Sequence, residues 1–392
     1  MSERPVAPLV AAKMSIPPPR DGAVERLRLQ TPMLDHSGAR LTVVVAPAGW
    51  GKTTLLSQWA HDLQQGCAVV WVSLDETDDD PVRFWSYVLT ALQGIGRVTT
   101  APLSALSTPG VSAVDLALPM LVNELSGVHG AYVLVLDDYH LVQHREIHEG
   151  MEFLLSYLPP SLRVVIASRM DPPLPIARMR ARGELNELRA ADLGFTVEEA
   201  AAMVRAVGDV SLDDVAAGLL WERTEGWAVG LQLAALSIRG AARPAAAAMA
   251  IHGDDRHILD YLSTEVLQRL RPQQRDLLVR TSVLERLSGR LCDDVLERQG
   301  SGAILDQLDR ADLFVVPLDA RHEWYRCHHL FREALRKELT DESESARCSY
   351  GQPNGSWPAT MSPRPSSCGW PPATRTGPVS YTHLTLPTTP YV

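Results

Sequence analysis

Short apolar runs alternate with helix-like stretches in the first half of the chain. The runs, rich in Val, Ile and Leu, are residues 41–46, 68–74, 131–136 and 162–167. Between them, apolar residues recur every three to four positions over residues 52–63, 81–92 and 148–158. Continuous apolar strands that alternate with helices are typical of a parallel sheet covered on both faces. We therefore expect a doubly wound α/β domain over about residues 35–190.

The pattern changes to helical from Thr196 onward. Thr196 and Glu199 have the spacing of a capping box, which predicts a helix start. The low-complexity stretch Ala242–Ala250 is expected to be a linker or a weakly packed helix. Later segments, including WYRCHHLFREALRKEL, are helical in pattern, with one strand-like piece at Leu313–Leu318. A compact winged-helix unit fits this order, and so does a plain helical bundle.

Residues 345–392 differ from the rest of the chain. They hold nine of its 28 prolines and have no apolar periodicity. Such a segment buries too little apolar surface to offset the entropy of ordering it. Two interpretations remain open: a native disordered tail, or a segment translated in a shifted frame after about Ser345. The last stretch, VSYTHLTLPTTPYV, is similar to a translated sequencing adapter, which favours the second.

Charge and composition indicate which classes of partner, such as nucleic acid or a membrane, this chain is expected not to bind. The chain has a net charge of −10, and three arginines with no acidic residue follow Glu344, so residues 1–344 carry −13. A body this acidic repels a phosphate backbone, and we expect it not to bind nucleic acid by itself. Five scattered cysteines indicate reduced thiols. With neither a signal peptide nor an apolar run long enough to span a bilayer, we expect a cytoplasmic protein without a membrane partner.

A glycine-rich turn follows the first apolar run and leads directly into a helical pattern. It fits the phosphate-loop pattern G-x-x-x-x-G-K-[ST], except that the first glycine is an alanine. The residues that match are Ala46, Pro47, Ala48, Gly49, Trp50, Gly51, Lys52 and Thr53. A strand, this turn and a helix follow one another along the chain. This order favours a nucleotide site over the alternative, which is a strand-to-helix turn that binds no ligand.

Each residue type that the phosphate-loop pattern specifies has a chemical role. Gly49 and Gly51 allow backbone N–H groups to turn inward around an anion at the helix start. Lys52 is expected to reach the β- and γ-phosphates, and the Thr53 hydroxyl to bind Mg²⁺. Thr54 follows and is expected to lie close to the α-phosphate.

Two further elements complete the expected site. The run YVLVLDDYH is a strand that ends in two aspartates, as a Walker B element does. Asp137 is expected to hold Mg²⁺ through its water shell, and Asp138 to orient an attacking water. Arg169 follows the next strand, at the carboxyl edge where ligands bind in open α/β sheets, and is expected to sense the γ-phosphate. An arginine there also fits a surface ion pair.

Together with their surroundings, these elements resemble the signal-transduction NTPases (STAND class) of the MalT type, the large ATP-binding LuxR-family transcriptional activators. The resemblance covers roughly residues 10–342. It is carried by the blocks APAGWGKTTLLSQWA, VSLDETDDDPVRFWSYVLTAL, VLVLDDYHLV, IASRMDPPLPIARMRARGELNEL, LGFTVEEA, TEGWAVGLQLAALSIRG, YLSTEVLQRL, LLVRTSVLERLSGRLCD and WYRCHHLFREAL.

The resemblance implies an order of domains. It places an N-terminal segment at 1–30, a P-loop nucleotide-binding domain at 31–192, a helical domain at 193–264, a winged-helix domain at 265–342 and a non-native or disordered tail at 343–392. In this family ADP holds an inactive form, whereas ATP and a small-molecule inducer favour a form that self-associates. DNA and RNA polymerase are contacted only through a C-terminal helix-turn-helix. The chain shows neither a repeat period nor a basic recognition helix in its tail.

The family's functional residues map onto matching positions. Lys52, Thr53 and Asp137 are implied to bind phosphate and magnesium, and Arg169 to be the sensor arginine. His328 matches the winged-helix histidine that contacts the β-phosphate of ADP, with its neighbour His329 a weaker candidate. The family usually has proline where this chain has Ala228, beside an adenine-side contact that starts at Gly226.

Three classes of function can be compared with these features. An ATP/ADP-dependent switch that hydrolyses ATP slowly accounts for the regulatory modules after the α/β domain. The alternative is a P-loop ATPase or kinase that acts as a metabolic enzyme, which needs a lid or a substrate pocket of its own. A scaffold with a degenerate site conflicts with the pairing of Lys52 and Thr53 with Asp137 and Asp138.

Overall fold

The computed structural model describes most of the chain up to Tyr350. The described residues are 8–20, 22–34, 38–64, 66–94, 96, 98–106, 112–127, 130–311 and 313–350, with the side chains of 31–34 and 342–350 excepted. The chain divides into the units Met1–Glu344 and Ser345–Val392, and all contacts below lie within the first. The tail expected to be disordered or non-native lies outside the described residues from position 351.

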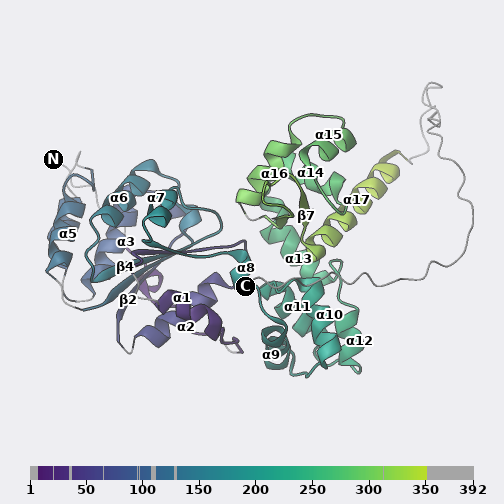
Figure 1. Cartoon of the computed structure of the whole chain (residues 1–392), viewed down its shortest axis with the longest axis horizontal. Coiled ribbons are helices and arrows are strands. Elements are labelled where there is room, and N and C mark those ends of the chain that lie inside the picture. The colour runs from purple at the N-terminus through teal and green to yellow at the C-terminus, as the bar shows by residue number, and fades with distance from the viewer. Residues whose placement is uncertain are drawn as a thin grey trace, which may run out of the picture. The chain divides into compact units, whose positions relative to one another are not determined.

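Five parallel strands form the central sheet, in the order β2-β3-β4-β1-β5 (Figure 1). The strands are β1 (Leu41–Val45), β2 (Ala68–Ser73), β3 (Tyr132–Asp137), β4 (Leu162–Ser168) and β5 (Leu185–Leu188). β1 lies between β4 and β5, with Val43 opposite Ile166 on one side and Glu187 on the other. The first four strands confirm the apolar runs seen in the sequence, and the parallel α/β class is confirmed.

Helices cover both faces of this sheet, as the continuous apolar strands predicted. Neighbouring residues of one strand belong to different apolar clusters: Val44 packs with Leu56 of α2 (Lys52–Leu63), whereas Val43 packs with the helices on the other face. Those are chiefly α3 (Pro81–Gln93), α5 (Ala117–Ser126), α6 (Arg145–Ser156) and α7 (Ile176–Ala181). The remaining elements of this part are η1 (Ala11–Met14), α1 (Leu27–Leu34), η2 (Glu76–Asp78), α4 (Ala101–Leu106), η3 (Tyr139–Leu141) and α8 (Ala190–Leu193).

A helical region follows the sheet. It consists of α9 (Val197–Gly208), α10 (Asp214–Thr224), α11 (Ala228–Ile238), α12 (Pro244–Met249), α13 (Arg256–Glu265) and η4 (Leu267–Arg269). The expected capping box is present: Glu199 N donates to Thr196 Oγ1 at 3.2 Å, and Thr196 N donates to Glu199 Oε2 at 3.0 Å. The low-complexity stretch contains a short helix, α12, with Ala248 fully buried.

The last described region has the elements of a winged helix. Three helices, a hairpin and a final helix follow one another as α14 (Pro272–Thr281), α15 (Gly289–Leu296), α16 (Ser301–Arg310), β6 (Val315–Pro317), β7 (Tyr325–Cys327) and α17 (His329–Tyr350). β6 confirms the strand-like piece, and pairs antiparallel with β7. An antiparallel bridge from Leu287 to Tyr325 joins the first helices to this hairpin.

Two expectations need correction. The sequence pattern predicts a helix throughout the stretch WYRCHHLFREALRKEL. In the structure Tyr325–Cys327 is a strand, and the helix begins only at His329. β-sheet pairing with β6 overrides the local helical pattern here. The edge strand β5 was not anticipated from apolar runs, because its sequence LNEL is short and half polar.

Candidate nucleotide site

The loop between β1 and α2 has the backbone of an anion-binding turn. Gly49 and Gly51 adopt positive φ angles of 79° and 76°, a left-handed conformation that glycine adopts at little cost. Gly51 caps α2, so the first N–H groups of that helix, which have no partner within it, face the loop. Gly51 O accepts a hydrogen bond from Leu55 N at 2.9 Å, which fixes the loop to the helix start.

A cavity of about 330 Å³ opens beside this loop, within the size range of small-molecule sites. Ala48, Gly49, Gly51, Lys52, Thr53 and Thr54 line it. Ala46, Pro47 and Trp50 do not line it. Their side chains are buried, and the loop's first position needs no glycine because its φ angle is negative.

Lys52 lies inside the loop and is 7% exposed. Its Nζ donates to Ala46 O at 2.7 Å and to Pro47 O at 3.0 Å. An ammonium group has three donors and no acceptor. A phosphate oxygen in the cavity therefore competes with these two carbonyls for the same cation.

Thr53 and Asp137 are brought together from distant parts of the sequence. Thr53 Oγ1 donates to Asp137 Oδ2 at 2.8 Å, and Asp137 is 3% exposed at the end of β3. Burial raises the pKa of Asp137 to about 6, and the charge of Asp138 contributes, whereas the Thr53 hydrogen bond and Lys52 act in the opposite direction. A hydroxyl and a carboxylate at a phosphate loop are oxygen ligands that suit Mg²⁺, which takes its remaining ligands from phosphates and water. These residues fit the implied ion.

Asp138 and Arg169 both line the cavity. Asp138 has a positive φ of 58°, which turns it out of the strand direction after Asp137. Arg169 follows β4 and lies 3.9 Å from Glu265 of α13, which also pairs with Arg269 at 2.9 Å. Arg169 thus lies at the cavity and also faces an acidic partner, and its role toward a γ-phosphate stays a prediction.

His140 is a residue that sequence reasoning missed. Its Nδ1 lies 3.8 Å from Asp138 Oδ1, and neither buried ring nitrogen has a hydrogen-bond partner. Burial, with Arg169, Lys52 and Arg269 nearby, lowers the pKa of His140 to about 3, so the ring is neutral at pH 7. Its position two residues after Asp138 was the available signal. An orphaned neutral imidazole beside Asp138 can take part in holding a water there.

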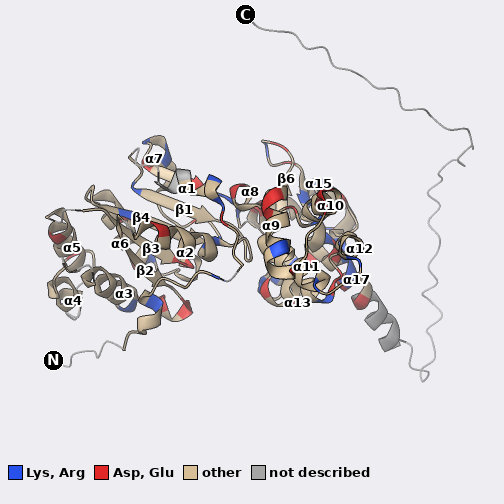
Figure 2. Ribbon diagram, turned by 90° about the horizontal axis from the view of Figure 1, so that it is seen from below, with Lys and Arg blue, Asp and Glu red and all other residues tan. Residues whose placement is uncertain are grey.

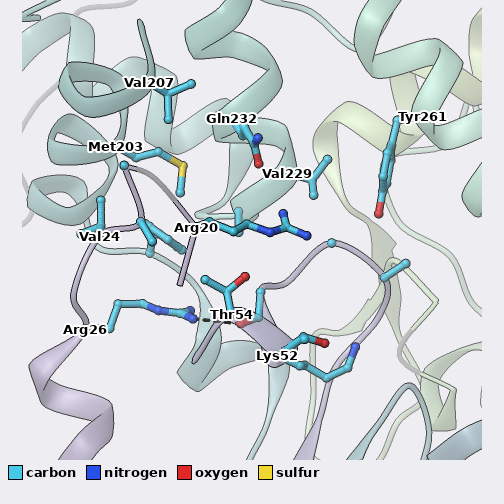
Figure 3. Close-up of a pocket in the computed structure, with 18 of the residues that line it drawn as sticks. Arg20, Val24, Arg26, Lys52, Thr54, Met203, Val207, Val229, Gln232 and Tyr261 are labelled. Atoms are coloured by element: carbon cyan, nitrogen blue, oxygen red, sulfur yellow. Dashed lines mark hydrogen bonds between the residues drawn. The ribbon is translucent and has the colours of Figure 1, made fainter. Parts of the chain in front are cut away.

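The N-terminal segment supplies a second group of residues that sequence reasoning missed. Arg20, Val24 and Arg26 line the cavity, and Figure 3 shows Arg20 extended between the phosphate loop and the helical region. They lie 26 to 32 positions before Lys52, in a segment without a recognisable motif. With Lys52 and Arg169, four cationic side chains and the single carboxylate of Asp138 line this cavity. This excess of positive charge among the lining side chains favours a polyanionic ligand.

Apolar side chains line the other end of the cavity. Val24 faces Met203 and Val207 of α9 (Figure 3). Phe195, from the link before α9, lines the same cavity. The amide of Gln232, from α11, is the polar group among them. A cavity that combines cationic side chains with an apolar wall fits a nucleotide, with phosphates at the loop and a base against these apolar side chains.

The turn before α11 contacts the phosphate loop directly. Val229 N donates to Gly49 O at 3.0 Å and Trp227 Nε1 donates to Ala48 O at 3.3 Å. Ala228 and Val229 line the cavity, whereas Gly226 is not among the described residues that do. The adenine-side contact expected here stays a prediction. Gly226 has a φ of +72°, and an added Cβ would lie 2.6 Å from Phe195 O.

His328 is placed differently from expectation. It is 2% exposed, its Nε2 lies 3.0 Å from Thr224 O, and its ring packs edge-on against Trp227 with centroids 5.9 Å apart. It is not among the described residues that line the cavity. His329 also lies outside, where its backbone N–H donates to Glu225 Oε1 at 2.9 Å. Both histidines thus contact the turn that contacts the phosphate loop, and not the cavity itself.

Outside this cavity, charges of both signs are mixed. Figure 2 shows Lys and Arg scattered with Asp and Glu along the helices of all three regions. Among the described residues, no helix is both long enough and apolar enough to span a bilayer.

Comparisons with known proteins agree with this architecture. Residues 263–347 match the family model of the MalT winged helix domain. The chain is 37% identical over 334 residues to the HTH-type transcriptional regulator MalT of Serratia proteamaculans, covering 84% of this chain and 36% of that protein. The MalT protein of Yersinia enterocolitica is 36% identical over 333 residues, with the same coverage. The chain spans about a third of the length of these curated relatives.

Among solved structures, the Walker-type ATPase PABY2304 of Pyrococcus abyssi is similar in fold. It is 12% identical, with a TM-score of 0.57 over 81% of this chain and 97% of that protein. At this identity the likeness concerns the fold alone, which is that of a P-loop NTPase. The sequence relatives, the winged-helix match and the geometry of the phosphate loop agree, and the chain is similar to the MalT regulators over 84% of its length.

Proposed function

We propose that this chain binds ATP or ADP with Mg²⁺ and acts as the nucleotide-dependent switch of a transcriptional regulator. One observation carries the proposal: the cavity at the phosphate loop is shared by two regions. Lys52, Thr53 and Arg169 come from the α/β part, whereas Val229 and Tyr261 come from the helical region. A nucleotide bound there contacts both, so its γ-phosphate can bias how they pack.

The proposal assigns a role to each residue of the site. Lys52 binds the β- and γ-phosphates, Thr53 and Asp137 hold Mg²⁺, and Thr54 lies at the α-phosphate. Asp138, with His140 beside it, orients the attacking water. Arg169 is 3.9 Å from Glu265, a distance at which a γ-phosphate competes well for the guanidinium.

The roles of the winged-helix histidines are proposed separately. His328 acts through the turn at Thr224–Trp227, which it contacts, and reaches the phosphates only in a different packing of the regions.

The finer assignments of domain and partner are also proposals. The regions are a nucleotide-binding domain to residue 192, a helical domain at 193–264 and a winged-helix domain at 265–342. The relatives carry the description HTH-type transcriptional regulator, and we infer that DNA binding belongs to a part of such proteins outside the residues that match this chain. We infer that an inducer, self-association and contacts with DNA and RNA polymerase involve that further part.

ATP turnover tests the switch against a metabolic enzyme. We expect the purified chain to bind ADP and ATP with one nucleotide per chain, and to hydrolyse ATP well below about 1 s⁻¹, the low end for kinases. Calorimetry gives the stoichiometry, and a phosphate-release assay gives the rate. Turnover well above 1 s⁻¹ without any effector would favour the enzyme. Failure to bind either nucleotide would refute the switch.

The raised pKa of Asp137 predicts a pH-dependent magnesium requirement. Mg²⁺ binds the ionised carboxylate, and burial makes that form costly in the metal-free protein, with a pKa of about 6. The ionised fraction is about a tenth at pH 5 and about nine-tenths at pH 7. The Mg²⁺-dependent part of nucleotide affinity is therefore expected to be present above pH 6 and to weaken about tenfold between pH 7 and pH 5.

Titration of Mg²⁺ at fixed nucleotide, at each pH, measures this effect. Asp137→Asn removes the ionisable group and serves as the control, because the phosphates of the nucleotide titrate equally in both proteins. Equal pH dependence in the two proteins would show that Asp137 does not hold the ion.

A further inference from the structure

Arg26 is the most buried arginine of the described part of the chain, with 3% of its surface exposed. Its guanidinium donates to two backbone carbonyls, through NH1 to Leu193 O at 2.9 Å and through NH2 to Gly51 O at 3.1 Å. It also stacks over the Phe195 ring, 4.9 Å from the centroid. One side chain of the N-terminal segment thus joins Gly51, the last residue before α2, to the link before the helical region.

This guanidinium forms no ion pair with any described residue, although the charge of Glu199 acts on it from a distance. Its hydrogen bonds go to carbonyls, and its buried Nε has no hydrogen-bond partner. Burial lowers the pKa of Arg26 to about 10, and the group remains charged at pH 7. Buried charges are normally paired, because an unpaired one is costly. Arg26 lines the cavity, and a bound polyphosphate supplies negative charge close to it.

The hydrogen bond from Arg26 to Gly51 O also fixes the orientation of the peptide between Gly51 and Lys52. A trans peptide points its C=O and the following N–H to opposite sides. Arg26 holds Gly51 O from one side, together with Leu55 N of the helix. The N–H of Lys52 in the same peptide then points the other way, as an anion-binding loop requires.

We propose that Arg26 is a positioning residue that couples nucleotide binding to the link between the α/β and helical regions. It acts through Gly51 on the phosphate loop and through Leu193 and Phe195 on that link. When nucleotide is bound, the loop carbonyl, Arg26 and residues 193–195 are held together. When Arg26 is absent, the loop and the link move independently. This role rests on nucleotide binding at the site proposed above.

Arg28 offers a matched control two residues away. It donates to Asp192 O and Gly194 O and pairs with Glu199 at 3.0 Å, on the same link. It does not line the cavity or contact the phosphate loop. Arg26→Met and Arg28→Met therefore each remove one arginine that binds this link, but only the first removes a contact with Gly51.

The test compares Mg-ADP binding by calorimetry in the wild type and the two variants. We expect Arg26→Met to weaken binding about tenfold, the effect of one charge-assisted hydrogen bond, and Arg28→Met to change it less than about twofold. Arg26→Lys keeps the charge but not the fork that spans two carbonyls, and should recover only part of the loss. Wild-type affinity in Arg26→Met, or equal losses in the two methionine variants, would overturn the proposal.

Hydrogen exchange in the unmodified chain provides a second measurement that needs no variant. Addition of Mg-ADP is expected to slow exchange of backbone amides both at residues 51–55 and at residues 193–196. Protection at the phosphate loop without protection of the link would refute the coupling. No ADP binding by the wild type would instead refute the nucleotide site itself, so the two failures are distinguishable.

Discussion

Lys52→Ala is expected to weaken binding of ATP and ADP by at least about 100-fold. Charge-assisted hydrogen bonds contribute about 1.5–3 kcal/mol each, and the ammonium of Lys52 can make two of them to phosphate oxygens. In the structure these donors are held in the loop by Ala46 O and Pro47 O. The substitution also leaves the cavity with three cationic side chains in place of four. Isothermal calorimetry measures the loss directly.

Lys337→Ala is the control for this substitution. Lys337 is half exposed and forms a surface pair with Asp341 at 3.2 Å on α17, so its loss changes the net charge by the same amount without touching the cavity. We expect its nucleotide affinity to equal that of the wild type. An affinity for Lys52→Ala within a few-fold of the wild type would remove the phosphate loop from the proposed function.

Gly49→Ala is expected to destabilise the nucleotide-free chain by about 2–4 kcal/mol. Two causes add. The φ angle of +79° is strained for any residue with a side chain. An added Cβ would also lie 2.8 Å from Trp227 Nε1 and 2.9 Å from both Tyr261 Oη and Val229 Cγ2. Because Trp227 is fully buried, it cannot swing away, and the loop or α11 must shift.

Gly51→Ala separates these two causes. Gly51 has a similar φ of +76°, but the nearest atom to an added Cβ is Arg26 NH2 at 3.3 Å. The backbone strain of about 1–2 kcal/mol is then the main cause, because Arg26 has to shift by only a few tenths of an ångström. Denaturant unfolding without nucleotide compares the two variants. Equal losses of stability would show that the contact between the phosphate loop and the helical region contributes little.

The sequence predicted the sheet and the phosphate loop because both depend on local patterns. Buried parallel strands read as apolar runs, and the glycines at 49 and 51 lie where the backbone needs positive φ. Asp137 was predicted from its place at a strand end, and the structure puts it 2.8 Å from Thr53. Parallel strands bring their carboxyl ends to one edge, so such pairs can be inferred from topology.

The rest of the site depends on long-range packing, which leaves little local signal. Arg20 and Arg26 come from a segment without a motif, and reach the cavity only because that segment lies along α2, where Ser57 Oγ donates to Pro17 O at 2.5 Å. The placement of His328 against Trp227 likewise depends on how two helical regions pack. The strand β7 was missed because its pairing partner, and not its own residues, determines its conformation.

The apolar cluster on the α2 face of the sheet does not end at the α/β region. It continues without a break from Val44 and Trp50 through Trp227 and Leu262 to Phe331 of α17. The boundaries expected near residues 192 and 264 are both crossed by this one apolar cluster. A shared core unfolds cooperatively, and its parts gain or lose stability together. A ligand that binds at the phosphate loop thereby stabilises the winged-helix region as well, although it does not contact that region.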